Sequence, residues 1–156
     1  MFPATRESAV DIVRVVHADD ALVEAYARLL PQLSRTASAL TLADLQAIVD
    51  APGTDVFIAI AKARQRIVGT LTLVHFRIPT GIRAWIEDVV VDRAARGLGA
   101  GAALTRAAIA HSRELGAKTL DLTSNPSRQA AHRLYESCGF ALRDTRVYRH
   151  QAQAPQ

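Results

Sequence analysis

The stretch between Ile86 and Leu104 holds the residues whose types and spacing could do chemistry. A valine-rich strand pattern ends there in a loop with glycines at positions 97, 99 and 101, and a helix pattern follows at once. Glycines lack a Cβ, so several backbone N–H groups can converge on one anion. The helix adds free N–H groups and the positive end of its dipole, and Arg96 adds a cation. The spacing therefore predicts a phosphate-binding loop.

Other glycine-rich loops fit this spacing less well. A Walker loop requires a Lys-Ser/Thr pair after its last glycine, and two alanines follow Gly101 instead. The relaxed dinucleotide fingerprint is matched up to Ala102, with Asp121 downstream at the spacing that ribose recognition requires. However, residues 92–96 separate the strand from the turn, Asp121 lies within a strand pattern, and too little chain remains for a second nucleotide-binding half. We therefore disfavour a dinucleotide site.

Two adjacent carboxylates, Glu87 and Asp88, occupy the strand before the loop. On a regular strand they would lie on opposite faces, each with apolar neighbours: Trp85, Val89 and Val91 on the face of Glu87, and Ile86 and Val90 on that of Asp88. Desolvation raises the pKa of a carboxylate in apolar surroundings, which suits a general base. Pairing with a nearby arginine is the structural alternative for either acid.

The elements that must position these residues follow from hydrophobic periodicity and from cap and turn residues. In the first half of the chain we expect a strand over 10–16, a helix that opens at Asp19 or Asp20 and is strained at Pro31, a capping-box helix from Thr41 to Pro52, and a hairpin of strands over 55–61 and 66–76. A strand over 84–91, a helix over 101–115 and a strand over 118–123 should follow. The last expected elements are a helix from an Asn125 cap through Pro126 to Gly139 and closing strands over 140–142 and 146–148. This order predicts a mixed α/β domain, antiparallel at first, with a right-handed crossover through the helix behind the glycine loop.

A second motif lies downstream, in Asn125-Pro-Ser-Arg-Gln-Ala-Ala-His-Arg-Leu-Tyr-Glu-Ser-Cys-Gly-Phe140. Together with Arg96-Gly-Leu-Gly-Ala-Gly101 behind the valine-rich strand, it resembles the GNAT superfamily of acetyl-CoA-dependent N-acetyltransferases, in which a pyrophosphate loop precedes an Asn…Ala-x-x-Leu-Tyr-x-x-x-Gly-Phe helix. The resemblance covers about residues 54–142. Within the superfamily, Ile86-Glu-Asp-Val-Val-Val91 is similar to the glucosamine-6-phosphate N-acetyltransferase branch.

The resemblance implies a GNAT-like fold, with a central, mostly antiparallel twisted sheet of about six to seven strands flanked by about four helices. It also implies transfer of an acetyl group from acetyl-CoA, as co-substrate and without a metal, to a primary amine of a small molecule by direct attack in a ternary complex. Two alternatives stay open: an acetyltransferase that acts on peptides or proteins, and a non-catalytic module that responds to CoA.

Residue roles carry over from the resemblance position by position. Tyr135 would give a proton or a strong hydrogen bond to the departing CoA sulfur, although its periodicity alone favours a core tyrosine. Glu87 would be the general base, with relayed water as the alternative, and Asp88 would contact the substrate. The backbone N–H of Val89 is the candidate donor to the oxyanion. The expected acetyl-CoA contacts are Val89, Val90, Val91, Arg96, Gly97, Leu98, Gly99, Ala100, Gly101, Ala102, Asn125, Ser127 and Arg128.

Arginines beside the expected site loops raise the question of the acceptor. Arg35, Arg77 and Arg83 could hold the anion of an amino-sugar phosphate, or they could be solvated surface residues. The arginines as a whole are dispersed, aromatic residues make up only 5% of the 156-residue chain, and the net charge is +4. A mildly basic surface with no nucleic-acid partner is therefore expected.

Composition also bounds the organisation of the chain. We expect one domain over residues 1–150 and a flexible tail over 151–156. Apolar runs are far shorter than the ~18 residues of a membrane span, and the first residues lack the apolar core of a secretory signal. The single cysteine, Cys138, fits a reducing cytoplasm and is expected to be buried, while the histidines show no ligand spacing for a metal. A homodimer is left open.

Overall fold

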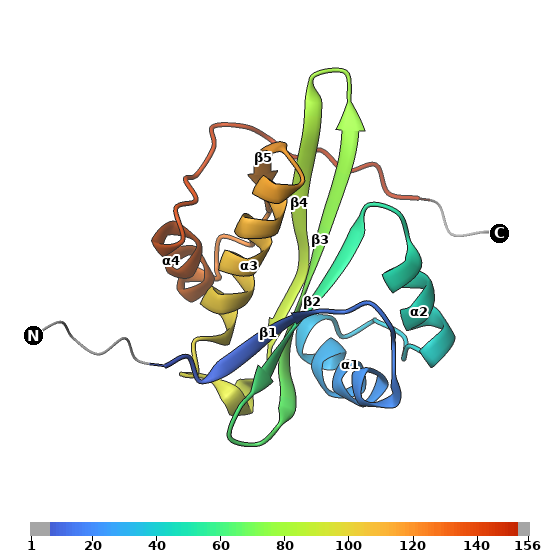
Figure 1. Ribbon diagram of the computed structural model, residues 1–156. Helices are drawn as coiled ribbons and strands as arrows, with labels where there is room; N and C mark the ends of the chain where they lie inside the picture. The colour runs from blue at the N-terminus through green and yellow to red at the C-terminus, as the bar shows by residue number, and fades with distance from the viewer. Residues whose placement is uncertain (1–6, 153–156) are drawn as a thin grey trace, which may run out of the picture.

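The centre of the molecule is a twisted sheet with helices on both of its faces (Figure 1). The computed structural model describes residues 7–152, and its strands follow the order β1-β2-β3-β4-β5. Neighbouring strands pair antiparallel except β5, which lies parallel to β4. The elements are β1 (Val10–Arg14), α1 (Asp20–Leu33), α2 (Leu42–Asp50), β2 (Thr54–Ala61), β3 (Arg66–Ile78), β4 (Gly81–Val91), a short 3₁₀ helix η1 (Arg93–Ala95), α3 (Ala100–Glu114), β5 (Ala117–Asp121) and α4 (Gln129–Ser137). The predicted α/β class is confirmed, with five strands in the described residues instead of six or seven.

Residues 1–6 and 153–156 lie outside the described part of the chain. They include most of the segment in which no secretory signal was found, and most of the predicted C-terminal tail. None of the described helices is long and apolar enough to cross a membrane.

The first two helices begin at the caps that the sequence predicts. The Asp19 carboxylate accepts the backbone N–H of Leu22 at 2.8 Å, and Thr41 and Asp44 form a capping box at the start of α2. Helix α1 runs through Pro31 to its end at Leu33. A proline removes a helical hydrogen bond, but in the last turn this loss does not stop the helix.

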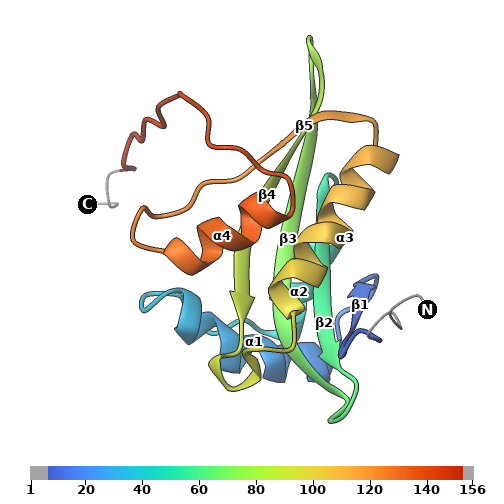
Figure 2. The same ribbon diagram turned by 90° about the vertical axis from the view of Figure 1, so that its left-hand side faces the viewer.

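Two apolar layers hold the helices to the sheet. On one face, Leu104 of α3 packs with Leu71 and Leu73 of β3, all fully buried. On the other face, α1 and α2 cover β2, where Tyr26 packs beside Ile58. Figure 2 shows α3 and α4 on the near side of the sheet, opposite α1 and α2. Because both helical layers pack on one sheet, their positions relative to β4, a strand of that sheet, are fixed.

A β-bulge interrupts the regular alternation of β4. The register pairs Thr70 of β3 with Val90 and Thr72 with Glu87, so β4 has one residue more than β3 across this interval. Asp88, within the bulge, has a φ of 48°. Aspartate adopts this left-handed conformation more readily than most residues with a side chain. The bulge lies beside the acidic pair that the sequence singles out.

The bulge changes which way the following side chains point. Ile86 and Val89 both contact the core on the α3 side, whereas Val90 packs with Leu29 of α1 on the other side. A regular strand would have placed Ile86 and Val90 on the same face, so the predicted alternation was wrong beyond the bulge. Both carboxylates of the pair are exposed, not held in apolar surroundings.

Asp55 joins four elements on the α3 side of the sheet. Its carboxylate lies 3.0 Å from Arg14 Nη1 of β1, 3.3 Å from His75 Nε2 of β3 and 3.0 Å from His111 Nε2 of α3. The other ring nitrogen of His111 lies 3.4 Å from a carboxylate oxygen of Glu114. Two histidines without ligand spacing in the sequence thus meet in the fold. Across residues 7–152, no three His, Cys, Asp or Glu side chains are grouped so as to hold a metal ion.

The chain beyond β5 departs most from the prediction. Asn125 does not cap a helix, because its side-chain oxygen accepts the N–H and hydroxyl of Ser127 at 2.9 and 2.8 Å. This local turn competes with helix formation, and α4 begins only at Gln129. It ends with Cys138 as its C-cap, half-buried instead of buried as predicted.

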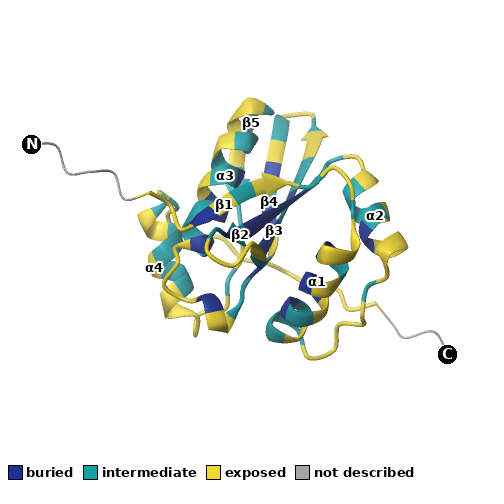
Figure 3. Cartoon of the chain, turned by 60° about the horizontal axis from the view of Figure 1, so that its bottom comes forward, coloured by how far each residue is buried: buried dark blue, intermediate teal, exposed yellow. Residues whose placement is uncertain are grey.

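The two closing strands predicted over 140–142 and 146–148 do not form. Residues 141–152 are exposed and contain no strand, as Figure 3 shows for the segment leading to the C-terminus. The apolar runs in this segment are short and separated by arginines, so a strand there would gain few contacts at the sheet edge. In the described residues β5 is therefore the last strand of the sheet.

Candidate functional site

A cavity opens where β4 and β5 separate. The two strands pair only from Ile82 with Ala117 to Trp85 with Asp121, and the bulge of β4 lies beyond the last pair. The cavity has a volume of about 170 Å³ and is lined by Leu33, Ile86, Glu87, Asp88, Val89, Leu122, Thr123, Ser124, Arg128 and Tyr135. It brings the acidic pair of β4 together with the tyrosine of α4, which the sequence separates by almost fifty positions.

The two carboxylates share their cavity with one cationic side chain, that of Arg128. Glu87 and Asp88 are both exposed at the cavity. Neither forms an ion pair with any residue between 7 and 152, so the alternative of pairing with an arginine has no support there. Adjacent unpaired carboxylates create a negative potential that attracts a cationic ligand.

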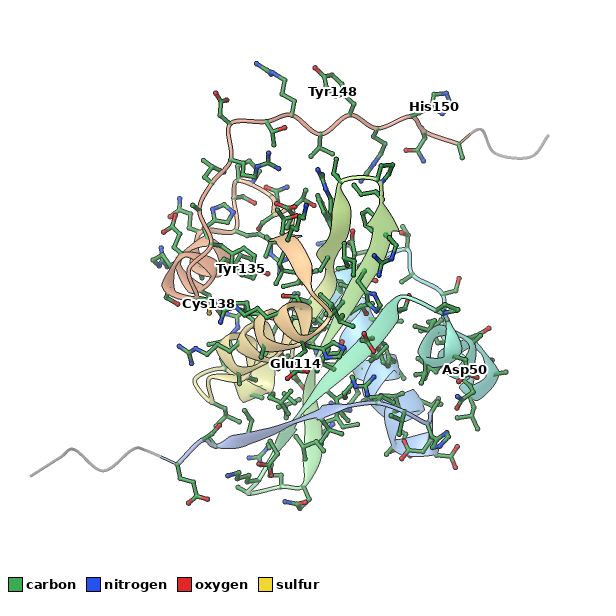
Figure 4. The ribbon with its side chains drawn as sticks, turned by 45° about the horizontal axis from the view of Figure 1, so that its top comes forward. Asp50, Glu114, Tyr135, Cys138, Tyr148 and His150 are labelled. Atoms are coloured by element: carbon green, nitrogen blue, oxygen red, sulfur yellow. The ribbon has the colours of Figure 1, made fainter. Side chains whose placement is uncertain are left out.

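Tyr135 reaches the cavity from α4, the helix that Figure 4 shows beside α3. Its ring meets that of Phe140 edge-on, with centroids 5.9 Å apart. Burial raises the pKa of the phenol, and the Arg128 guanidinium lowers it to a smaller extent. Since an ordinary phenol has a pKa of about 10, the Tyr135 hydroxyl is protonated at neutral pH and able to donate a hydrogen bond. The tyrosine is half-buried and lines the site, unlike a core tyrosine.

The glycine loop leads from η1 into α3. Gly97 and Gly99 have φ angles of 88° and 75°, which residues with a side chain rarely adopt. A Cβ built on either glycine would have no atom within 4 Å, so the space beside both is open. Gly99 is the N-cap of α3, whose first N–H groups have no acceptor within the helix. The loop therefore offers room and donors for an anion, as a pyrophosphate requires.

Gly101 differs from the other two glycines. Its φ is not left-handed, and a Cβ there would lie only 2.9 Å from Cδ1 of Leu134 on α4. The absence of a side chain lets α4 approach α3, which places the helix that carries Tyr135. Of the other predicted loop contacts, Arg96 and Leu98 are exposed, Ala102 is half-buried and Ala100 is buried.

Helix α1 holds the start of this loop, which the sequence reasoning missed. Arg28 Nη1 lies 3.1 Å from the Asp92 carboxylate. Gln32 donates to the same carboxylate at 3.3 Å and accepts the backbone N–H of Arg93 at 2.9 Å. The N–H of Ala94 is the main cause that lowers the pKa of Asp92, with Gln32 and Arg28 acting in the same direction. The sequence gives one indication of this contact: Arg28 and Gln32 are one helical turn apart and therefore lie on the same face of α1.

Not every predicted site residue lies at the cavity. Val90 and Val91 pack into the apolar layers. Asn125 and Ser127 bond to each other in the turn before α4, next to Arg128, which lines the site. Conversely, the sequence reasoning missed Leu33, Leu122, Thr123 and Ser124, which line the cavity because α1 and the end of β5 converge on it.

The three arginines proposed for an acceptor anion do not gather. Arg77 lines a second cavity, of about 460 Å³, near the turn of the β3–β4 hairpin, together with Pro52, Gly53, His75, Phe76, Ile82 and Leu115. Arg83 pairs with Phe76 in the same hairpin. Arg35 lies two positions after Leu33, and Arg83 lies three positions before Ile86, but neither arginine lines the first cavity.

The comparisons with known proteins agree with this geometry. The model of the acetyltransferase (GNAT) family matches residues 20–140, which is most of the chain, so the protein belongs to this family and is an acetyltransferase. Members of the family use acetyl-CoA as the acyl donor. No curated protein matches the chain.

Solved structures share the fold over nearly their whole length. A candidate acetyltransferase from Agrobacterium tumefaciens str. C58 is 27% identical, with 90% of this chain and 99% of that one covered and a TM-score of 0.73. A glucosamine-6-phosphate N-acetyltransferase from Arabidopsis thaliana is 19% identical over 90% and 97%, with a TM-score of 0.73. An aminoglycoside acetyltransferase from an uncultured soil metagenomic sample, in complex with sisomicin, is 20% identical over 94% and 97%, with a TM-score of 0.79. The last two show likeness of fold alone.

Proposed function

We propose that this acetyltransferase moves the acetyl group of acetyl-CoA to a primary amine of a small molecule, by direct attack in a ternary complex at the cavity between β4 and β5. The observation that supports it is the convergence of the acidic pair and Tyr135 on that cavity. The glycine loop, with its open space and free helical N–H groups, fits the pyrophosphate of CoA.

The reaction makes three demands that residues of the site can meet. An alkylammonium with a pKa near 10 must lose a proton before it attacks, and Glu87 is the proposed base. The attack places negative charge on the carbonyl oxygen, for which the Val89 N–H in the bulge is the proposed donor. Collapse of the tetrahedral intermediate breaks the carbon–sulfur bond, and Tyr135 donates a hydrogen bond or proton to the departing sulfur.

The free carboxylates favour one kind of acceptor. Glu87 and Asp88 would attract an amine that carries more than one positive charge, such as a polyamine or an aminoglycoside. An amino-sugar phosphate would need cations for its phosphate. Arg128 is the one arginine in the lining of this cavity, where it stands beside two carboxylates, and Arg77 lines the other cavity. We therefore place multiply charged amines ahead of amino-sugar phosphates among the candidate acceptors.

A turnover screen tests the proposal. CoA thiol release from acetyl-CoA is measured with polyamines, aminoglycosides, amino-sugar phosphates, arylalkylamines, amino acids and peptides, and the acetylated nitrogen is identified by mass spectrometry. We expect the highest kcat/KM with multiply charged small amines. Preference for peptides would establish the peptide or protein acetyltransferase instead, and tight acetyl-CoA binding with no turnover of any amine would establish the CoA-responsive module. A cytoplasmic location and a homodimer also remain proposals, and sedimentation of the purified chain tests the dimer.

A further inference from the structure

The cavity that Arg77 lines has no role in the proposed acetyl transfer. It lies where the β3–β4 hairpin meets the end of α3 and the turn before β2, and it has a volume of about 460 Å³. Its lining shares no residue with the cavity that holds the acidic pair and Tyr135. Figure 1 shows the hairpin extending past the neighbouring strands at this end of the sheet. Sites for small molecules typically span about 300–1,000 Å³, so the cavity is large enough to hold one.

Contacts between three elements hold the walls of this cavity in place. The backbone N–H of His75 donates to the Gly53 carbonyl at 2.8 Å. A Cβ on Gly53 would lie only 2.5 Å from the carbonyl oxygen of His75, so the turn can approach β3 this closely because it has a glycine there. His75 Nε2 lies 3.3 Å from the Asp55 carboxylate, which is also 3.0 Å from His111 Nε2 of α3. The turn, β3 and α3 are therefore fixed around a preformed space.

The lining combines an apolar wall with one cation. The wall is made by Pro52, Phe76, Ile82 and Leu115. Arg77 lies two residues after His75, on the sheet face that α3 covers, and pairs with Ile82 of β4. Arg77 forms no ion pair with any residue between 7 and 152. No carboxylate is among the described residues that line the cavity.

The carboxylates next to this lining already have partners. Asp55 has Arg14 Nη1 at 3.0 Å besides the two histidines, and it is 13% exposed. Glu114, which precedes Leu115, lies 3.4 Å from His111 Nδ1. The unpaired charge at the cavity is therefore that of Arg77, which favours an anion. The acidic pair at the other cavity favours a cation, so the two cavities select ligands of opposite charge.

We propose that this cavity is a second ligand site, which binds a small carboxylate with an aromatic or branched aliphatic body. The carboxylate pairs with the Arg77 guanidinium, whose planar donors match its two oxygens. The body packs on Phe76, Ile82 and Leu115, where burial of apolar surface stabilises the complex. The proposal does not rest on the proposed function, and binding is measurable without turnover.

The test is an NMR titration of the folded, full-length chain with indole-3-acetate, phenylacetate and acetate, and with phenylacetamide as the uncharged match. We expect saturable shifts of the backbone amides of Gly53, Arg77, Ile82 and Leu115. Affinity should increase from acetate to indole-3-acetate as more apolar surface is buried, and phenylacetamide should bind more weakly than phenylacetate. Saturating acetyl-CoA should leave these affinities unchanged, because the two cavities share no lining residue.

Two matched variants test the cation. Arg77→Gln removes it, and Arg83→Gln is the control, because Arg83 is an exposed arginine of the same hairpin that does not line the cavity. We expect the dissociation constant of phenylacetate to rise about 5- to 10-fold in Arg77→Gln, between the effects of an exposed ion pair and of a charged hydrogen bond. It should equal the wild-type value in Arg83→Gln. Both arginines are exposed, so both variants should keep the wild-type thermal midpoint.

Four results would overturn the proposal. They are the absence of saturable shifts at these amides in the millimolar range, equal affinities for phenylacetamide and phenylacetate, equal losses in Arg77→Gln and Arg83→Gln, and displacement of phenylacetate by acetyl-CoA. The last result would place the carboxylate at the glycine loop instead. If the wild type acetylated no amine, the proposed function would fail, and the titration would still decide whether this second site exists.

Discussion

At the scale of single residues, the site depends on groups from two elements that line one cavity. Tyr135 comes from α4 and the acidic pair from β4. The tyrosine is partly buried and its pKa is raised, so it stays protonated, whereas Glu87 and Asp88 are exposed. A protonated donor and carboxylates that line one cavity are the groups that acid and base roles require.

Replacing Tyr135 by phenylalanine removes one oxygen and leaves the ring to pack against Phe140. We expect turnover to fall about 10²- to 10⁴-fold, the usual loss of general acid catalysis. The thermal midpoint changes little, and acetyl-CoA affinity changes only slightly because the backbone donors of the glycine loop are kept. Turnover is measured beside calorimetric titration of acetyl-CoA. Near-normal turnover would assign Tyr135 a purely structural role.

Replacing Glu87 by glutamine keeps the shape of the side chain and removes a proton acceptor. Activity should fall most near neutral pH and recover in part in alkali, where more of the amine is already neutral. The pH–rate profile of Glu87→Gln against wild type tests this. A profile lowered by the same factor at every pH would indicate that relayed water, deprotonated elsewhere, serves as the base.

At the scale of elements, the anion loop is built by the junction of η1 and α3 and is held by α1. Gly99 begins α3 with a left-handed φ of 75° and Gly116 follows its end with the same φ. Both glycines have open space where a Cβ would lie. A side chain at either glycine strains the backbone equally. A substitution at Gly99 therefore tests the loop, and the same substitution at Gly116 is its control.

We expect Gly99→Val to weaken acetyl-CoA binding strongly, because its side chain occupies the space for the pyrophosphate. Gly116→Val should lower the thermal midpoint to a similar extent and leave the affinity unchanged. Calorimetric titration of the two folded variants distinguishes these outcomes. Equal affinities would show that the loop is not the site of CoA binding.

A further element-scale prediction concerns Asp92, which fastens η1 to α1. Its lowered pKa means that the carboxylate stabilises the folded state while ionised, and that this contribution is lost as the pH falls through the folded-state value, below about pH 4. In Asp92→Asn the ionisable group is absent, so the fall of the thermal midpoint below about pH 4 should be smaller than in wild type. Thermal midpoints measured from about pH 6 down to about pH 3 test this, and parallel declines would contradict it.

At the scale of the whole molecule, Asp55 ties β1, β3 and α3 to β2 at a distance from the site. The carboxylate is 13% exposed and faces one arginine and two histidines. Hydrogen bonds to charged groups contribute about 1.5–3 kcal/mol, so Asp55 contributes to how the α3 layer is held on the sheet. None of these residues lines the cavity between β4 and β5.

We therefore expect Asp55→Asn to lower the thermal midpoint by several degrees, since about 1 kcal/mol corresponds to ~2–4 °C in a domain of this size. Acetyl-CoA affinity at 25 °C should be unchanged. Asp11→Asn is the control, because Asp11 is an exposed carboxylate 3.6 Å from Lys62 and such surface pairs contribute little. If the thermal midpoint of Asp55→Asn is no lower than that of Asp11→Asn, the Asp55 contacts do not stabilise the fold.

The sequence by itself determined what depends on near neighbours in the chain. The caps at Asp19 and Thr41, the β2–β3 hairpin and the glycine loop before α3 all form as predicted, because each is set by residues within a few positions. The family also followed from the sequence, since the two motifs and their spacing lie along one chain.

Only the tertiary structure decided what depends on partners distant in sequence. The bulge at Asp88 arises from the register between β4 and β3, and no property of β4 alone predicts it. A Cβ at Gly101 would meet the side chain of Leu134 on another helix, and Arg77 lines the other cavity, near the turn of the hairpin. The strands predicted over 140–142 and 146–148 do not form for the same reason. A strand persists only when it pairs with the edge of a sheet, and the short apolar runs in this segment offer too few contacts for such pairing.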